Sequence, residues 1–409
     1  MRKLVIELVS SQTTQTKPLF GAVFNNIVSK KLIEDFQNLT DIVVIMNENM
    51  KIDEDFRIYI SQSRVKVETI SRLSEIKDIL PNDSDVLYFS PMNLHGFEFL
   101  PNNVKSASVV HDIRDYVIYS TALKNIENER LHYAINKYNS LNDLMAYCLS
   151  HFSPWLYGKI MNMRGEKWLS EFIVKLKKAD GIIFNSMCTQ KRVTSVSPES
   201  FNGKKVAVIY PPVNRTESNN LKTSHENIPE SFFLMLSAGR KEKNLNAVLA
   251  GFEEFCKQNE KNPFFLVLTG TTSQLEKHIK KKYKYAGKVI CVPYTSQENV
   301  DHLISNCTAL LMPSIDEGFG HPVLEAMNAG APIVCSDIPI FREISDGYST
   351  FFKYNDSKAL SEILYLFSKP KYRENQSIDE RANKGVWYKD ESELRLDSIS
   401  SFVLSLLLE

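Results

Sequence analysis

The chain lacks an apolar stretch as long as a membrane-spanning helix requires. No segment reaches the roughly 18 consecutive apolar residues that cross a bilayer. The first residues, MRKLVIELVSSQ, are too short an apolar run for a signal peptide, because Glu7 interrupts them. These absences predict a cytoplasmic protein. A location at the inner face of the membrane stays an alternative.

Excess charge and paired cysteines are absent as well. Lys and Arg together number 49 and Asp and Glu number 49, so the formal net charge is zero. No global basic field therefore argues for nucleic acid as a partner. The 6 cysteines include no Cys-x-x-Cys pair, so we expect reduced thiols.

What the chain does contain is an alternation of short apolar runs with longer amphipathic segments. With 409 residues it is long enough for two or three domains. The alternation is the βα rhythm of a parallel, doubly wound sheet. The first set of strands is expected at residues 3–9, 41–47, 65–70, 85–90, 107–112, 181–186 and 205–211.

A polar stretch interrupts this rhythm and predicts an interdomain linker at 213–230. We expect an N-terminal Rossmann-like domain over 1–212, a C-terminal one over 231–387 facing it across a cleft, and a C-terminal helix (388–409) that packs on the first domain. The second set of strands is expected at 232–239, 264–270, 288–294, 309–314 and 331–337, with helices at 245–258, 273–283, 296–306 and 322–329.

Residues 116–178 depart from the rhythm, because they are aromatic and mainly helical. One interpretation is a helical insertion that packs on the first domain. The other is a surface for a lipid-linked acceptor, with peripheral membrane contact. In that interpretation Trp168, Phe172 and Leu176 form an apolar stripe flanked by lysines.

The segment SIDEGFGHPVLEAMNAGAPIVCSD, residues 314–337, holds Glu317 and Glu325, eight positions apart. Gly318 and Gly320 let the backbone between them approach a phosphate or sugar closely. A proline in the first turn and a glycine just past the end delimit a short helix. That helix begins at the carboxyl edge of a strand, where open α/β sheets bind ligands and a helix N-terminus favours anions.

Each glutamate alone has an ordinary interpretation. Glu325 can be a first-turn residue favoured by the helix dipole, and Glu317 can be a solvated loop carboxylate. Together, around a glycine loop that follows a strand, they favour a sugar-nucleotide site. A carboxylate accepts hydrogen bonds from two vicinal hydroxyls such as those of ribose.

The first turn of the same domain, in SAGRKEKNL, adds cations to this edge. Arg240 and Lys243 precede Asn244, which we expect to cap the next helix. The helix dipole disfavours cations at that end, so they make sense if an anion lies between. Arg and Lys both suit a diphosphate, although a solvated basic turn is the alternative.

The stretches EGFGHPVLEAMNAGAPIVCSD, GRKEKNL and FFLVLTG resemble a known family. The chain is similar to the retaining GT-B glycosyltransferases marked by E-x7-E, glycosyltransferase family four, or glycosyl transferases group 1. The resemblance is strong over about 232–345 and moderate over 105–112 and 179–213. It implies a GT-B fold and a nucleotide-diphosphate sugar, GDP- or UDP-linked, in the second domain.

The resemblance also implies roles for individual residues. Glu325 would bind the ribose hydroxyls, while Arg240 and Lys243 would hold the diphosphate and stabilise the leaving group. The donor sugar would contact Glu317, Gly318, Phe319 and Gly320.

In the first domain, VVHDIRD places His111 and Asp112 near the donor sugar by the same resemblance, and Ser186 is a further candidate for lining the cleft. The family's glycine-rich first turn is reduced to Gly21, which is a departure in the part that positions the acceptor. No metal or other cofactor is expected. The stretch Asp83-Ser-Asp85 precedes a strand, so it is interpreted as a polar turn rather than a metal motif.

The expected function is transfer of a hexose, with mannose favoured, to a glycan or lipid-linked acceptor in bacterial surface polysaccharide synthesis. Two alternatives stay open. One is a GT-B epimerase or phosphorylase, and the other is a non-catalytic sugar-nucleotide binding protein.

Overall fold

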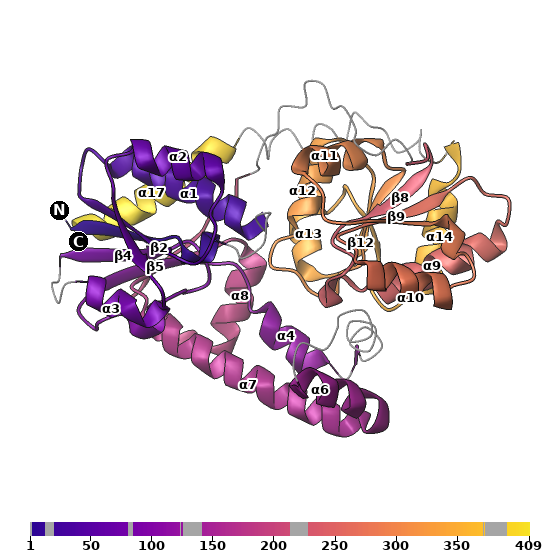
Figure 1. Cartoon of the computed structure of the whole chain (residues 1–409), viewed down its shortest axis with the longest axis horizontal. Helices are drawn as coiled ribbons and strands as arrows, with labels where there is room; N and C mark the ends of the chain where they lie inside the picture. Colours follow the sequence, from indigo (N-terminus) through magenta and orange to yellow (C-terminus); the bar gives the residue numbers. More distant parts are fainter. Residues whose placement is uncertain are drawn as a thin grey trace. The chain divides into compact units, whose positions relative to one another are not determined.

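The computed structural model describes residues 2–12, 20–80, 85–122, 124–125, 141–212, 228–370, 372 and 391–409. The chain divides into two compact units (Figure 1). The first unit contains residues 1–113, 167–214 and 391–409, and the second contains residues 114–166 and 215–390. The predicted linker lies largely outside the described residues.

The first unit is built on a seven-stranded parallel sheet with the order β3-β2-β1-β4-β5-β6-β7. Its central strands are rich in Val, Ile and Leu and buried, as expected for a parallel sheet that is covered on both faces. The strands are β1 (Lys3–Glu7), β2 (Ile42–Asn47), β3 (Lys66–Ile70), β4 (Val86–Ser90), β5 (Lys105–Val110), β6 (Gly181–Phe184) and β7 (Lys205–Val208).

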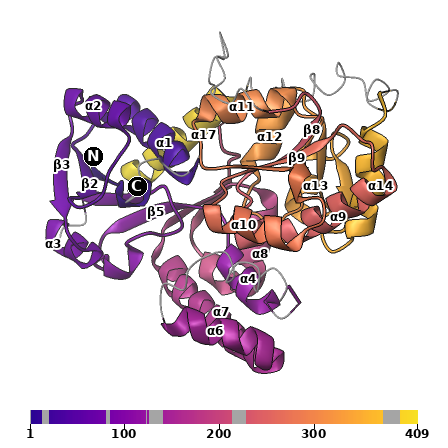
Figure 2. The ribbon, with the colours of Figure 1, turned by 45° about the vertical axis from the view of Figure 1, so that its right-hand side comes forward.

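The last helix of the chain, α17 (Ser392–Leu408), is part of this first unit. It contacts α1 (Phe20–Phe36), and the two helices lie beside each other in Figure 2, yellow and indigo. Phe402 and Leu406 of α17 are buried in the same core cluster as β1 and β4. A methyl group added at Gly181 would collide with both of these side chains. The first sheet therefore depends on a segment more than 200 residues downstream of β6.

Other helices of this unit are α2 (Glu54–Gln62), α3 (Ile76–Ile79) and α8 (Met187–Val196).

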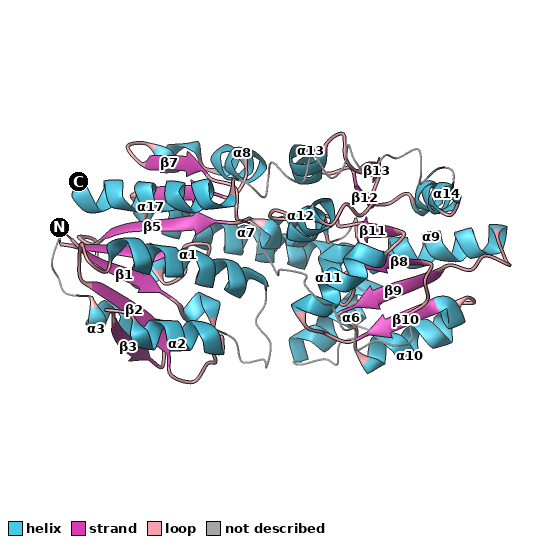
Figure 3. Ribbon diagram, turned by 90° about the horizontal axis from the view of Figure 1, so that it is seen from above, coloured by secondary structure: helices cyan, strands magenta, loops and turns pink. Residues whose placement is uncertain are grey.

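The second unit contains a six-stranded parallel sheet with the order β10-β9-β8-β11-β12-β13 (Figure 3). Its strands are β8 (Phe232–Met235), β9 (Phe265–Thr269), β10 (Val289–Val292), β11 (Ala309–Met312), β12 (Ile333–Ser336) and β13 (Thr350–Phe352). The helices around it are α9 (Leu245–Gln258), α10 (Ser273–Lys282), α11 (Gln297–Asn306), α12 (His321–Asn328), α13 (Pro339–Ser345) and α14 (Ser357–Phe367).

Both sheets share one topology. In each, the first strand lies between the second and the fourth, so the strand order reverses between β1 and β4 and between β8 and β11. At such a switch point the connections leave in opposite directions, and a crevice opens outside the carboxyl ends of the strands. The two-domain α/β prediction with parallel sheets is confirmed.

The sequence predicted every strand except β13. In the second domain it did not predict α13 or α14. β13 has only three residues, too few for a periodic signal. α14 did carry a signal, because SKALSEILYLF has apolar residues at helical spacing and Asp356 accepts a hydrogen bond from Ala359 at its start.

The helical segment between β5 and β6 forms α4 (Arg114–Thr121), α6 (Leu141–Phe152) and α7 (Pro154–Lys178). The segment was expected in the first domain, whereas residues 114–166 group with the second unit and residues 167–178 with the first. A small core of its own holds it together, formed by Ala122, Ala146, Tyr157 and Met161.

The apolar stripe predicted on α7 does not face outward. Phe172 and Leu176 are buried, and Trp168 stacks on Phe172 at 5.3 Å between ring centroids. The flanking Lys175 pairs with Glu98 at 3.0 Å. This stripe packs against protein, which corrects its interpretation as a membrane-facing surface. Across the described ranges, no helix is both long and apolar enough to cross a bilayer.

Candidate functional site

The switch point of the second sheet brings together two residues that the sequence singled out separately. Lys243 lies in the turn after β8, and Glu317 lies in the loop after β11. The Lys243 ammonium donates to Oε1 of Glu317 at 2.5 Å, and the Ser314 hydroxyl donates to the same oxygen at 2.7 Å. Lys243 is 4% exposed and Glu317 is 7% exposed. The site therefore contains a buried ion pair that joins the two neighbouring loops.

The ion pair decides the charge state of Glu317. Burial alone would raise the pKa of this carboxyl, since the charged form loses hydration. The Lys243 ammonium, the Arg114 guanidinium and the Ser314 hydroxyl outweigh that effect and lower the pKa of Glu317 to about 2. Glu317 is consequently a permanently charged hydrogen-bond acceptor at physiological pH.

The loop between the two glutamates needs glycine at position 320. Gly320 has φ +92°, and a methyl group added there would approach the Phe341 ring to 2.7 Å. Phe319 is buried beside the His321 ring, at 5.2 Å between centroids. The loop is thus fixed from both sides, and α12 begins immediately after it.

Glu325 is the fifth residue of α12, and the first turn of that helix contains no acidic residue. The interpretation of Glu325 as a dipole-favoured first-turn residue is therefore wrong. Glu325 is partly buried, and loss of hydration raises its pKa to about 7, with the Asp301 carboxylate adding to the rise. A carboxyl with this pKa changes protonation near neutral pH.

Arg240 lies at the rim of the same turn, with its side chain 40% exposed and paired with Glu242. Sequence reasoning counted only the cations of GRKEK and missed this glutamate. Burial would raise the pKa of Glu242, yet Arg240 and Arg114 outweigh it and the pKa is lowered. Arg114 lies 3.8 Å from Glu242. Glu242 therefore orients Arg240 and partly neutralises it.

Asn244 stands at the N-terminus of α9, but its side chain does not cap the helix as predicted. Asn244 has φ +56°. Its side-chain amide nitrogen donates to the carbonyl oxygen of Pro313 at 3.1 Å and to that of Tyr354 at 2.6 Å. Asn244 ties the turn after β8 to the loop after β11, which is how Lys243 comes to face Glu317.

In the first unit, His111 and Asp112 directly follow β5, as expected from the sequence. The backbone N–H groups of both donate to the Asn93 side-chain oxygen, at 2.6 and 3.4 Å. The His111 ring stands edge-on to Phe24 with centroids 4.9 Å apart, and its Nε2 lies 2.9 Å from the Pro91 carbonyl oxygen. The ring orientation of His111 is therefore set by its own domain.

Ser186 does not line a binding surface. It is fully buried, and its hydroxyl oxygen accepts a hydrogen bond from the Thr189 N–H at 3.0 Å. It caps the N-terminus of α8, a frequent role for serine after a strand. The assignment of Ser186 as a substrate-binding residue is corrected on this ground.

No cluster of three or more His, Cys, Asp or Glu residues suited to a metal ion occurs among the described residues. Asp83 of the Asp83-Ser-Asp85 stretch lies outside them.

The fold and the site can now be compared with known proteins. Residues 218–384 match the family described as glycosyl transferases group 1, and this range contains the Lys243–Glu317 pair, Arg240 and Glu325. The match to this family therefore lies in the second domain. The group 1 match confirms the family suggested by the E-x7-E segment.

Proteins similar to this chain include glycosyltransferases of O-antigen synthesis. Over 161 residues it is 27% identical to the O-antigen chain mannosyltransferase RfbU of Salmonella typhimurium, covering 39% of this chain and 43% of RfbU. It is 21% identical to the O-antigen biosynthesis glycosyltransferase WclY of Escherichia coli, covering 86% of this chain and 88% of WclY. The match to the mannosyltransferase WbdA of Escherichia coli spans only 24% of WbdA. The chain thus spans less than half the length of RfbU and WbdA.

Solved structures share the fold at low identity. The sucrose-phosphate synthase of Thermosynechococcus elongatus superposes with a TM-score of 0.65 at 11% identity, covering 100% of both chains. HepE of Anabaena, in complex with UDP and glucose, gives a TM-score of 0.59 at 14% identity, covering 100% of this chain and 99% of HepE. These likenesses establish the GT-B fold of the chain.

Proposed function

We propose that this protein is a retaining glycosyltransferase that moves a hexose, mannose foremost, from a nucleotide-diphosphate sugar to a glycan or lipid-linked acceptor in polysaccharide synthesis. The observation that carries the proposal is the gathering of Lys243, Arg240 and Glu317 at the switch point of the second sheet. The mannosyltransferase names of RfbU and WbdA support mannose as the sugar.

The donor would extend along the motif. Glu325 would accept the ribose hydroxyls, and Glu317 with the backbone of Gly318, Phe319 and Gly320 would contact the sugar. Arg240, whose guanidinium is the more exposed of the two cations, would meet the diphosphate first. Lys243 would then divide its three N–H donors between Glu317 and a phosphate oxygen.

Catalysis would come from the cations. Breaking the bond between the sugar and the diphosphate develops negative charge on the leaving group, and fixed cations stabilise that charge more in the transition state than in the ground state. His111 and Asp112, which follow β5, are proposed to contact the sugar that is transferred. Glu317 is assigned no nucleophilic role, because its carboxylate is already held by Lys243 and Ser314.

The reaction is proposed to proceed without a metal ion, with Arg240 and Lys243 supplying the positive charge at the diphosphate. Retention of activity after dialysis against EDTA is the expected result. Loss of activity that added Mg²⁺ or Mn²⁺ restores would reject metal independence while leaving the donor site intact.

We further propose that the protein works at the inner face of a membrane, in contact with anionic lipid. Phe152 at the end of α6 is 87% exposed and Trp155 at the start of α7 is 69% exposed. Residues 144–165 contain no Asp or Glu, whereas Lys159 and Arg164 add positive charge. Exposed aromatic side chains next to cations suit the headgroup region of a bilayer.

The membrane proposal has a direct test. The purified protein should co-sediment with vesicles containing phosphatidylglycerol, and a Phe152→Ser/Trp155→Ser variant should stay in the supernatant. Leu39→Ser, at another exposed apolar residue, is the matched control. Equal sedimentation of all three proteins would reject this surface.

The donor proposal is tested by thermal shift with UDP, GDP, ADP and their sugars, followed by transfer from the radiolabelled donor that stabilises the protein most. Stabilisation by GDP-mannose and transfer of mannose is the expected result. If no nucleotide sugar shifts the melting temperature, the proposed function is wrong.

A further inference from the structure

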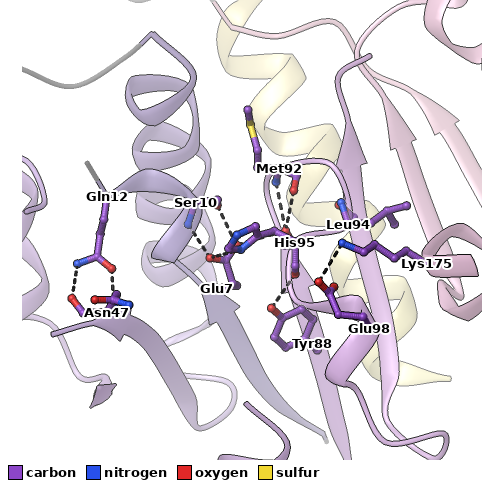
Figure 4. Close-up of polar contacts among 12 residues, drawn as sticks. Glu7, Ser10, Gln12, Asn47, Tyr88, Met92, Leu94, His95, Glu98 and Lys175 are labelled. Carbon is purple, nitrogen blue, oxygen red and sulfur yellow. Dashed lines mark hydrogen bonds and ion pairs between the residues drawn. The ribbon is translucent and has the colours of Figure 1, made fainter. Parts of the chain in front are cut away.

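A second acid–base pair, of which only the glutamate is fully buried, lies in the first unit at the switch point of its sheet (Figure 4). Glu7 ends β1, and His95 lies in the loop that follows β4. The two side chains point toward one another, with Nδ1 of His95 3.0 Å from Oε1 of Glu7. Sequence reasoning used Glu7 only as an interruption of an apolar run. That interruption was itself a signal, since a carboxylate at the end of a buried strand needs partners.

Glu7 is 0% exposed and fully engaged. Its oxygens accept hydrogen bonds from the Ser10 N–H at 2.6 Å, the Ser10 hydroxyl at 2.8 Å and the Ser90 hydroxyl at 3.3 Å. The segment after Ser10 is held in turn, because Gln12 exchanges hydrogen bonds with the backbone of Asn47 at the end of β2. The carboxylate is thus a fixed element of the sheet edge.

The loop that carries His95 is strained. Asn93 has φ +42°, Leu94 has φ +60° and Gly96 has φ +79°, all in the left-handed region that side-chain-bearing residues avoid. The surroundings hold the loop in place, since the Tyr88 hydroxyl donates to the His95 carbonyl at 2.9 Å. Such strain concentrates at functional sites, where the rest of the fold sustains it.

The pair occupies the position that Lys243 and Glu317 occupy in the second domain. In each sheet, one partner follows the first strand and the other follows the fourth. Both domains thus place a buried glutamate and a basic side chain where open α/β sheets bind ligands.

A purely structural pair would leave nothing for a ligand to bind. The His95 side chain, however, is 32% exposed. Its Nδ1 faces Glu7, and no partner within the described part of the chain bonds its Nε2. A carboxylate this close to one ring nitrogen favours the proton on that nitrogen, which leaves the lone pair on the other.

We propose that Glu7 and His95 form an acceptor-binding site, in which Nε2 of His95 accepts a hydrogen bond from a hydroxyl group of the acceptor sugar. This inference rests on the proposed glycosyltransferase function and assigns acceptor recognition to the first domain. Glu7 is the positioning residue, because it acts on the acceptor only through the ring that it orients.

The proposal makes acceptor binding depend on pH. The groups that act on the His95 ring are Glu7 from β1, Glu98 from the turn after β4 and Lys175 from α7, which pairs with Glu98. Burial lowers the pKa of His95, but the Glu7 carboxylate outweighs burial and the net pKa is raised. Below that pKa, Nε2 carries a proton and can no longer accept from a hydroxyl.

The test uses the full chain, labelled with ¹³C at histidine Cε1, and a mixture of methyl glycosides of mannose, glucose, galactose, rhamnose and N-acetylglucosamine. His95→Phe identifies the His95 signal among the 8 histidines. The glycosides should shift that signal in the unsubstituted protein. In transfer assays, His95→Phe should raise the acceptor KM about tenfold, the loss of one hydrogen bond. The donor KM should not change, and neither should any constant of the control His302→Phe.

A pH profile separates recognition from folding. In the unsubstituted protein the acceptor KM should rise as the pH falls through the pKa of His95, while kcat changes little. Glu7→Gln removes the charge that raises this pKa, so the transition should move to lower pH. An unmoved His95 signal with glycosides, or an unchanged acceptor KM in His95→Phe, would overturn the inference. If instead no nucleotide sugar binds, the proposed function fails, while a glycoside-induced shift would still support the sugar site.

Discussion

The ammonium group of Lys243 lies 2.5 Å from a carboxylate oxygen of Glu317, and the two residues are 74 positions apart in the chain. Both had been expected to meet the donor, one at the diphosphate and the other at the sugar. In the structure they meet each other. The pair therefore joins the two loops, and in the proposed donor site a diphosphate would share the lysine with Glu317.

Removing one partner of this pair should destabilise the second domain. Lys243→Met leaves the Glu317 carboxylate buried without its cation, which costs about 3–5 kcal/mol. The urea midpoint of the second domain's unfolding transition measures this. Lys257→Met, at an exposed lysine that pairs with Glu254, should change stability by less than about 0.5 kcal/mol. If Lys243→Met is as mild as this control, the pair contributes nothing to stability.

The two glutamates of the motif should give opposite pH dependences of stability. The pKa of Glu317 is lowered from 4.5 to about 2, so its stabilisation is present above pH 4.5 and is lost as the pH falls toward 2. The pKa of Glu325 is raised from 4.5 to about 7, so stability falls as the pH rises from 4.5 to 7. Urea midpoints from pH 3 to pH 8 test both, at roughly unit steps.

Substitutions separate the two contributions. Glu325→Gln should match the unsubstituted protein at pH values near 4.5 and exceed it increasingly toward 7. Glu317→Gln should lose stability above pH 4.5, because Lys243 then lacks its anion. Parallel profiles for all three proteins would show that neither carboxyl is shifted as described.

The protonation of Glu325 should also control donor affinity. If its carboxylate accepts the ribose hydroxyls, affinity for GDP-mannose should increase as the pH rises through about 7. Glu325→Gln should bind more weakly and show no such increase. The calorimetry should use GDP-mannose rather than GDP, because the terminal phosphate of GDP itself titrates at about pH 6. A pH-independent affinity in the unsubstituted protein would argue against the ribose role.

The sequence predicted every strand except β13, because buried parallel strands leave plain apolar runs, as in FFLVLT before Gly270. It predicted Glu317, Glu325, Arg240 and Lys243 as candidates because their spacing around turns is local. It could not predict that Lys243 meets Glu317, since that depends on β8 and β11 being neighbours.

The side-chain roles of Ser186 and Asn244 could not be predicted from the sequence. Ser186 and Asn244 both stand at helix starts, but only the structure shows that Ser186 caps its helix while Asn244 bonds two distant carbonyls. The same limit hid Glu7 and His95. Nothing local in the sequence links the end of β1 to the loop after β4.

Gly320 should tolerate no side chain. Gly320→Ala would combine an unfavourable φ of +92° with a contact of 2.7 Å to Phe341, and we expect a loss of about 1–3 kcal/mol and weaker donor binding. The control is Gly203→Ala, which has φ +72° but open space around the added methyl group. It carries the backbone strain without the collision. Equal losses in urea unfolding for both variants would mean that the Phe341 contact is unimportant.

Arg240 should matter for turnover more than for stability. Its side chain is 40% exposed, so Arg240→Ala should leave the unfolding midpoint nearly unchanged. Loss of one charge-stabilising group typically lowers kcat by about 10²–10³-fold. Arg240→Lys should recover only part of this, because an ammonium lacks the planar fork of a guanidinium. A kcat within about twofold of the unsubstituted value in Arg240→Ala would exclude it from the reaction.

The position of α17 has a consequence for how the protein is made. The ribosome releases β1 to β7 long before residues 392–408 exist, yet those residues complete the core around β1, β4 and Gly181. The described strands of the second domain end at Phe352, so its sheet can form before α17 has been made. Until α17 has been made, the first domain exposes an apolar face. During that time chaperone binding and aggregation compete with its folding. The order of maturation is thus the reverse of the order of synthesis.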